Sequence, residues 1–142
     1  MAKDLVRVVL DTNVLLVSVS DKSRLHWVFA RFLDAAYYLC VTTEILNEYA
    51  EILTRHMGDA RTQQVLKTIL KAPNTLLITP YYRFNLLQDP DDNKFVDCAI
   101  AANAGCIVSH DRDFLPLQHI EFPKVAVVDT AGFRELLFLQ KS

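Results

Sequence analysis

The sequence predicts an α/β fold, a three-layer α/β/α sandwich with a mostly parallel central sheet. Two observations lead to this prediction. Short, continuous apolar segments alternate with longer segments of helical periodicity, and the apolar segments lack the strict alternation of a two-faced strand. The chain of 142 residues, 51% hydrophobic and 23% charged, shows no linker and no internal repeat. Residues 1–142 are therefore expected to form a single domain.

The expected elements follow one another in a regular order. Strands are predicted where β-branched and other apolar residues run on, at 5–10, 37–42, 75–79, 106–110 and 124–129. Helices are predicted where apolar residues recur every three or four positions, at 23–36, 44–56, 60–71 and 91–104, with a last helix from Thr130. Thr42 or Thr43 is a suitable N-cap for the second helix, and Asp and Pro precede the fourth.

Acidic residues directly follow two of the predicted strands. Asp11 lies at the carboxyl end of the strand in VVLDTNVLL, and Asp111 follows the strand in CIVSHDRDFL, with Asp113 two residues further on. In doubly wound sheets, ligands bind beyond the carboxyl ends of the strands, near the point where strand order reverses. We therefore expect these carboxylates to lie at the functional edge of the sheet.

Two further acids lie on predicted helices. Glu48 is three residues after Ile45 and four before Ile52, so it shares a face with an apolar stripe that points toward the sheet. Asp97 lies within KFVDCAIAA, where aspartate has poor helix propensity and no capping role. Taken singly, Asp11 is explained as a turn residue and Glu48 as a solvated one. Together, the acids favour a shared site.

A divalent cation is the expected compensation for such a cluster. Neighbouring carboxylates repel one another and lose hydration on burial. No Lys or Arg is placed to form a buried ion pair with Asp11, Glu48 or Asp97, although Lys94 lies one turn before Asp97. Because all the ligands are oxygens, without C-x-x-C or paired His, Mg²⁺ or Mn²⁺ is favoured over Zn²⁺.

Other features have ordinary interpretations. Asp91 and Asp92 are assigned to the cap and dipole of the helix at 91–104. Cys40, Cys98 and Cys106 have apolar neighbours and no metal spacing, so they are expected to be reduced core residues. A net charge of −2 argues against a broad basic surface that coats nucleic acid. The lack of a long apolar run or a secretory signal favours a cytoplasmic location.

Four segments, taken in order, resemble the PIN domain, a family of metal-dependent ribonucleases. They are VVLDTNVLL, TTEILNEYAEIL, DPDDNKFVDCAIAA and CIVSHDRDFL. The resemblance covers nearly the whole chain, from about Val8 to Leu137. It points in particular to the VapC-like toxin components of bacterial and archaeal toxin–antitoxin pairs. It implies a PIN-like, Rossmann-like fold, hydrolysis of RNA phosphodiesters, a homodimer, and a small antitoxin protein that blocks the site.

The resemblance also implies roles for individual residues. The catalytic acids would be Asp11, Glu48, Asp97 and Asp111, and the metal ligands Asp11, Asp97 and Asp111, with Asp113 as an auxiliary acid. Polar residues that orient these carboxylates would be Thr12, Asn13 and Ser109. Lys94 and Arg112, beside the expected site, are candidates for contact with the RNA substrate.

Other functions stay open at this point. A phosphatase of the haloacid-dehalogenase type also begins with an Asp after its first strand, but its D-x-D motif would need a second Asp where this chain has Asn13. A phosphate-accepting receiver domain shares the doubly wound fold, yet TLLITPYY lacks its acceptor Asp and VAVVDTAG its Lys. The third alternative is an RNA- or metal-binding PIN-fold module without turnover.

Overall fold

A five-stranded parallel sheet forms the centre of the computed structural model, which describes residues 4–140. Its strands are β1 (Arg7–Leu10), β2 (Tyr38–Val41), β3 (Thr75–Leu77), β4 (Cys106–Val108) and β5 (Val127–Val128). Their order is β3-β2-β1-β4-β5, and every neighbouring pair is parallel. The chain moves outward from β1 to β3 and then returns to the other side of β1 as β4. The carboxyl ends of β1 and β4 therefore flank the point where strand order reverses.

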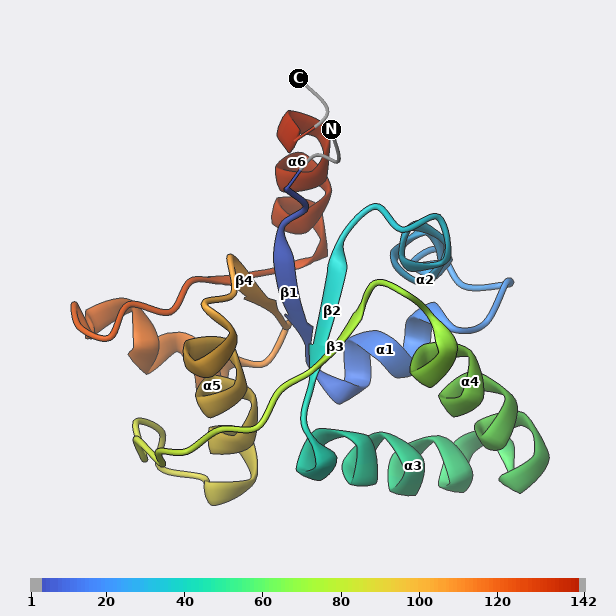
Figure 1. The fold of residues 1–142 in the computed structure, drawn as a ribbon, viewed down its shortest axis with the longest axis horizontal. Helices are drawn as coiled ribbons and strands as arrows, with labels where there is room; N and C mark the ends of the chain where they lie inside the picture. Colours follow the sequence, from blue (N-terminus) through green and yellow to red (C-terminus); the bar gives the residue numbers. More distant parts are fainter. Residues whose placement is uncertain (1–3, 141–142) are drawn as a thin grey trace.

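Helices cover both faces of this sheet, which confirms the predicted three-layer architecture. They are α1 (Thr12–Ser18), α2 (His26–Leu33), α3 (Thr43–Met57), α4 (Asp59–Lys71), α5 (Pro90–Ala102), η1 (Arg112–His119) and α6 (Thr130–Gln140), where η1 is a 3-10 helix. Figure 1 shows α5 and η1 on one side of the strands and α1 to α4 on the other. Right-handed crossovers explain the two groups of helices. The chain moves in one direction across the sheet up to β3 and then reverses, so α5 and η1 lie on the opposite face.

The hydrophobic core is centred on β1 and on the two strands that flank it. Val8 and Val9 of β1 are fully buried, and Val8 pairs with Leu39 of β2 and Cys106 of β4. Helix α5 is buried on most sides because it contacts β1, β2 and β4. All three cysteines are buried and free, as expected for reduced core residues.

The buried Tyr49 hydroxyl links α3 to β1. It donates a hydrogen bond of 2.6 Å to the main-chain carbonyl of Leu10, the residue before Asp11. Burial raises the pKa of Tyr49, so the hydroxyl stays protonated and able to donate. We expect Tyr49→Phe to lower the free energy of unfolding by about 1–3 kcal/mol, because a buried carbonyl loses its hydroxyl partner. Urea denaturation measures this, with the exposed Tyr81→Phe as the control; equal stability of the two variants would contradict it.

Two short helices differ from the elements predicted from the sequence. Helix α1 begins directly after Asp11 and was not predicted. Its segment VLLVS is as apolar as the preceding strand, so the sequence shows no visible switch from strand to helix periodicity. Helix η1 contains Pro116, which removes a main-chain donor and disfavours a helix prediction. The strands are also shorter than predicted; for example, β5 has two residues. Thr42 is the N-cap of α3 and accepts a hydrogen bond from the Ile45 amide at 3.1 Å.

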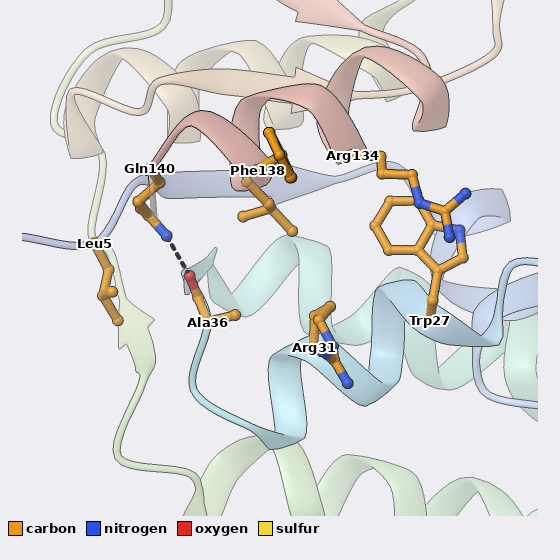
Figure 2. Close-up of a pocket in the computed structure, with 8 residues that line it drawn as sticks. Leu5, Trp27, Arg31, Ala36, Arg134, Phe138 and Gln140 are labelled. Carbon is orange, nitrogen blue, oxygen red and sulfur yellow. Dashed lines mark hydrogen bonds between the residues drawn. The ribbon is translucent and has the colours of Figure 1, made fainter. Parts of the chain in front are cut away.

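A hollow of about 540 Å³ lies between α2 and α6, at the amino-terminal side of β1. Figure 2 shows the Arg134 guanidinium over the Trp27 ring, with a centroid distance of 5.2 Å, and Gln140 donating to the Ala36 carbonyl. The described residues that line it are mostly apolar and include no carboxylate. In the part of the chain that the structure describes, no helix is long and apolar enough to cross a membrane.

Candidate active site

A chain of hydrogen bonds joins the carboxyl ends of β1 and β4. The Asp11 carboxylate accepts a hydrogen bond of 2.7 Å from the Ser109 hydroxyl. The Ser109 oxygen in turn accepts from the Asp111 amide at 3.0 Å, and the Asp111 carboxylate accepts from the Asp113 amide at 2.9 Å. Asp11 and Ser109 are buried, whereas Asp111 and Asp113 are exposed. Ser109 therefore fixes the Asp11 carboxylate at the strand edge.

Glu48 of α3 faces the same edge, held from two sides. The Thr12 hydroxyl, at the first position of α1, donates to one carboxylate oxygen of Glu48. Lys94 of α5 forms a half-buried ion pair with the other oxygen, with an N–O distance of 2.7 Å. The expectation that no cation is placed to pair with Glu48 is therefore wrong. Lys94 lies one helical turn before Asp97 but pairs with Glu48, not with Asp97. The pairing is possible because α5, which carries Lys94, contacts α3, which carries Glu48.

A second group of carboxylates lies at the start of α5. Oxygen atoms of Asp89, Asp92 and Asp113 lie within 4.8 Å of one another. Asp89 is the N-cap of α5 and accepts from the Asp91 amide at 2.9 Å. Asp92 lies in the first turn, and its Oδ2 atom is buried without a hydrogen-bond partner among the described residues. The assignment of Asp91 and Asp92 to the cap is wrong because Asp89 makes the cap, but both lie in the first turn, as their assignment to the helix dipole expected.

The electrostatic environment joins the two groups of acids into one site. Burial raises the pKa of Asp11 above its ordinary value, the charges of Asp111 and Glu48 add to the rise, and hydrogen bonds from Ser109 and Thr12 oppose it. Burial raises the pKa of Asp92 to about 6, and four carboxylates contribute, those of Asp89, Asp111, Asp113 and Asp11. Asp113 links the two groups by geometry, because its amide donates to the Asp111 carboxylate and its own carboxylate lies within 4.8 Å of those of Asp89 and Asp92.

Asp97, which the sequence suggested as a member of this site, lies elsewhere. Its carboxylate accepts a hydrogen bond of 3.1 Å from the Phe84 amide, and the charges acting on it are those of Arg83 and Glu44. Asp97 is five residues after Asp92, which places the two about 140° apart around α5. Burial raises the pKa of Asp97 as well. The structure thus brings together Asp11, Glu48, Asp111 and Asp113, adds Asp92, and places Asp97 at a neighbouring segment.

The remaining predicted site residues lie at the rim. Asn13 is exposed and lines a hollow of about 310 Å³ together with Asp11 and Asp111. Arg112 is exposed beside Asp111. A sequence signal for Asp92 was present: DPDD places two acids after the cap and proline, and the start of this helix meets the carboxyl edge of a parallel sheet.

The donor set fits a hard divalent cation. The carboxylates of Asp11, Asp92, Asp111 and Asp113 supply only oxygen ligands, which Mg²⁺ and Mn²⁺ prefer. The unpartnered Oδ2 of Asp92 leaves a buried anionic oxygen without compensation, and leaving such a group unpaired is costly. A cation bound among these residues would supply that compensation.

The parallel sheet is Rossmann-like, and acidic residues lie at the carboxyl ends of its central strands, as in α/β proteins of the PIN-like class. The chain belongs to the PIN domain family, whose model matches residues 7–113. No curated protein sequence matches the chain significantly.

Solved structures share the fold at low sequence identity. VapBC2 from Rickettsia felis, bound to a DNA fragment from its promoter, aligns with a TM-score of 0.62 at 15% identity, over 87% of this chain and 98% of that chain. DNA-bound VapBC from Salmonella typhimurium aligns with a TM-score of 0.55 at 15% identity, over 88% and 98%. The PIN domain endonuclease Utp24 aligns with a TM-score of 0.51 at 16% identity, over 87% and 84%.

Proposed function

We propose that this PIN domain is a Mg²⁺- or Mn²⁺-dependent ribonuclease that hydrolyses RNA phosphodiester bonds. The observation that best supports the proposal is the convergence of carboxylates from β1, β4, α3 and α5 on one sheet edge, with an unpartnered Asp92 oxygen among them. A fold without such chemistry would gain stability from neutral residues there, because the acids raise one another's pKa.

The residues of the site have distinct proposed roles. Asp11, Asp92, Asp111 and Asp113 would hold the cation, and Asp89, with a carboxylate oxygen within 4.8 Å of those of Asp92 and Asp113, would add negative charge beside it. A bound divalent cation supplies acidification of a water molecule and neutralises charge that develops on the phosphate. Ser109 fixes the orientation of Asp11. Glu48, held by Thr12 and Lys94, would orient the attacking water through its carboxylate.

The biological context is part of the proposal. We infer that the protein is the toxin of a toxin–antitoxin pair, acts in the cytoplasm as a homodimer, and is blocked by a small antitoxin protein. The support is the family membership and the fold shared with the VapBC complexes of Rickettsia felis and Salmonella typhimurium. The PIN domain endonuclease Utp24 has the same fold, so the fold supports nuclease activity in general, and the VapBC complexes support the toxin role.

The test is cleavage of a mixed RNA pool by the purified protein in Mg²⁺ or Mn²⁺. We expect cleavage that stops with EDTA and that falls by at least about 10²-fold in Asp11→Asn, because a preorganised charge at the reacting centre is lost. Asp21→Asn, a substitution on an exposed residue of a turn, is the matched control and should cleave like the wild type.

Three outcomes would contradict the proposal. Cleavage by the purified protein that persists in EDTA and in Asp11→Asn would show that neither a divalent cation nor this carboxylate is required. Release of phosphate from small phosphomonoesters, without RNA cleavage, would favour the phosphatase alternative. RNA or metal binding without any cleavage would favour a module that has no turnover.

A further inference from the structure

An exposed aromatic and basic segment runs beside the acidic edge. After β3 the chain continues without regular structure to α5, and Figure 1 shows this connection crossing from β3 to the start of α5. Within it, the side chains of Tyr81 and Tyr82 are 88% and 75% exposed, and Phe84 is 38% exposed. We call residues 81–84 the aromatic segment. Exposed aromatic rings in succession have no role in the core, so they need another explanation.

Helix α5 holds this connection through two residues on one face. The Asn93 side chain forms reciprocal hydrogen bonds with Leu87, accepting from its amide at 2.8 Å and donating to its carbonyl at 3.0 Å. Four residues later, Asp97 accepts from the Phe84 amide at 3.1 Å. Both side chains are buried. The main chain of the connection is therefore held at Phe84 and Leu87, while the rings of Tyr81 and Tyr82 stay in solvent.

The aromatic segment is also linked to the site by charge. Arg83 forms an ion pair with Glu44 of α3 at 2.9 Å, one turn before Glu48, and its side chain is still 73% exposed. Tyr81 lines a small hollow together with Lys94, the residue that pairs with Glu48. Both cations therefore lie near the exposed rings and pair with acids of α3, and Arg83 is the one whose side chain stays largely exposed.

We propose that the aromatic segment binds single-stranded RNA by base stacking on Tyr81 and Tyr82, with the largely exposed Arg83 next to the backbone. This inference rests on the proposed ribonuclease function and assigns the aromatic segment as the part of the chain that holds the unpaired strand. Stacking on aromatic rings beside cationic side chains is the general means of binding single strands without sequence preference. A duplex keeps its bases stacked inside and offers no free base faces to these rings.

The test separates binding from cleavage. We measure the Kd of a fluorescent single-stranded RNA oligomer by anisotropy in EDTA, for wild type and the double variant Tyr81→Ala/Tyr82→Ala. We expect the double variant to bind at least about 10-fold more weakly, since each alanine removes a ring on which a base stacks. In Mg²⁺, KM should rise by a similar factor with little change in kcat. Tyr81→Phe/Tyr82→Phe keeps both rings and should bind like the wild type.

The controls address folding and charge. Phe138→Ala removes a ring that is 72% exposed on α6, beside the hollow of Figure 2, and should leave RNA binding unchanged. An oligomer with abasic positions should bind wild type and the double alanine variant equally. Equal Kd values of wild type and the double alanine variant for the intact oligomer would overturn the inference, even if the RNA is cleaved. Ring-dependent binding without cleavage would support the inference and contradict the ribonuclease proposal alone.

Discussion

Asp92→Asn is expected to lower metal-dependent RNA cleavage by about 10²- to 10³-fold, whereas Asp97→Asn should cleave nearly like the wild type. Asp92 places an unpartnered carboxylate oxygen among the acids of the site, and its neutral amide would be a poor cation ligand. Asp97 accepts a hydrogen bond from the Phe84 amide, and the amide oxygen of an asparagine preserves that contact.

The measurement is the initial rate of cleavage of one RNA at saturating Mg²⁺, with thermal melting as a check of folding. Asp91→Asn is the matched control, because Asp91 is exposed and adjacent to Asp92 in the same helical turn. Loss of activity in Asp97→Asn, together with an active Asp92→Asn, would reverse the assignment and restore the one suggested by the sequence.

Mg²⁺ or Mn²⁺ is expected to raise the melting temperature, and the rise should be larger at pH 7.5 than at pH 5. A ligand present at 100 times its Kd stabilises the folded state by about 2.7 kcal/mol, or on the order of 10 °C for a domain of this size. Cation binding needs ionised carboxylates, and Asp92 has a pKa of about 6, so protons compete with the cation at pH 5.

Without metal the pH dependence has the opposite sign. The pKa of Asp92 is raised from 3.8 to about 6, so between these pH values the unfolded chain releases a proton that the folded chain retains. The free energy of unfolding should therefore fall as pH rises through this window. Differential scanning calorimetry with and without EDTA measures both effects, and Asp92→Asn should reduce both. An unchanged melting temperature in millimolar Mg²⁺ and Mn²⁺ at pH 7.5 would contradict the cation site.

The sequence predicted the order of strands and long helices because each has a clear apolar period. The prediction of acids at strand ends also needed only topology: the carboxyl ends of β1 and β4 meet, so Asp11 and Asp111 come together. That they form a catalytic site stays a prediction. The roles of the residues on helices were harder to predict, because they depend on rotation about the helix axis.

Asp97 and Asp92 illustrate this limit. Asp97 seemed unusual for its apolar surroundings, and Asp92 seemed ordinary for its place near a helix start. The structure reverses their placement, since the first turn of α5 is the part that meets the carboxyl edge, whereas Asp97 meets a connection with no periodicity. The pairing of Lys94 with Glu48 likewise requires the contact of α3 with α5, which no local pattern encodes.

Helix α5 has a consequence for how metal and RNA would affect one another. Its first turn presents the acids proposed to bind the cation, and the next turns fasten the connection that displays the tyrosines. One helix would thus contact both proposed ligands, so an ion that orders the start of α5 would also hold the aromatic segment in place. By thermodynamic linkage, bound RNA would raise the affinity for the ion by the same factor. The affinity for the cation would therefore be lower in the free protein than in its complex with RNA.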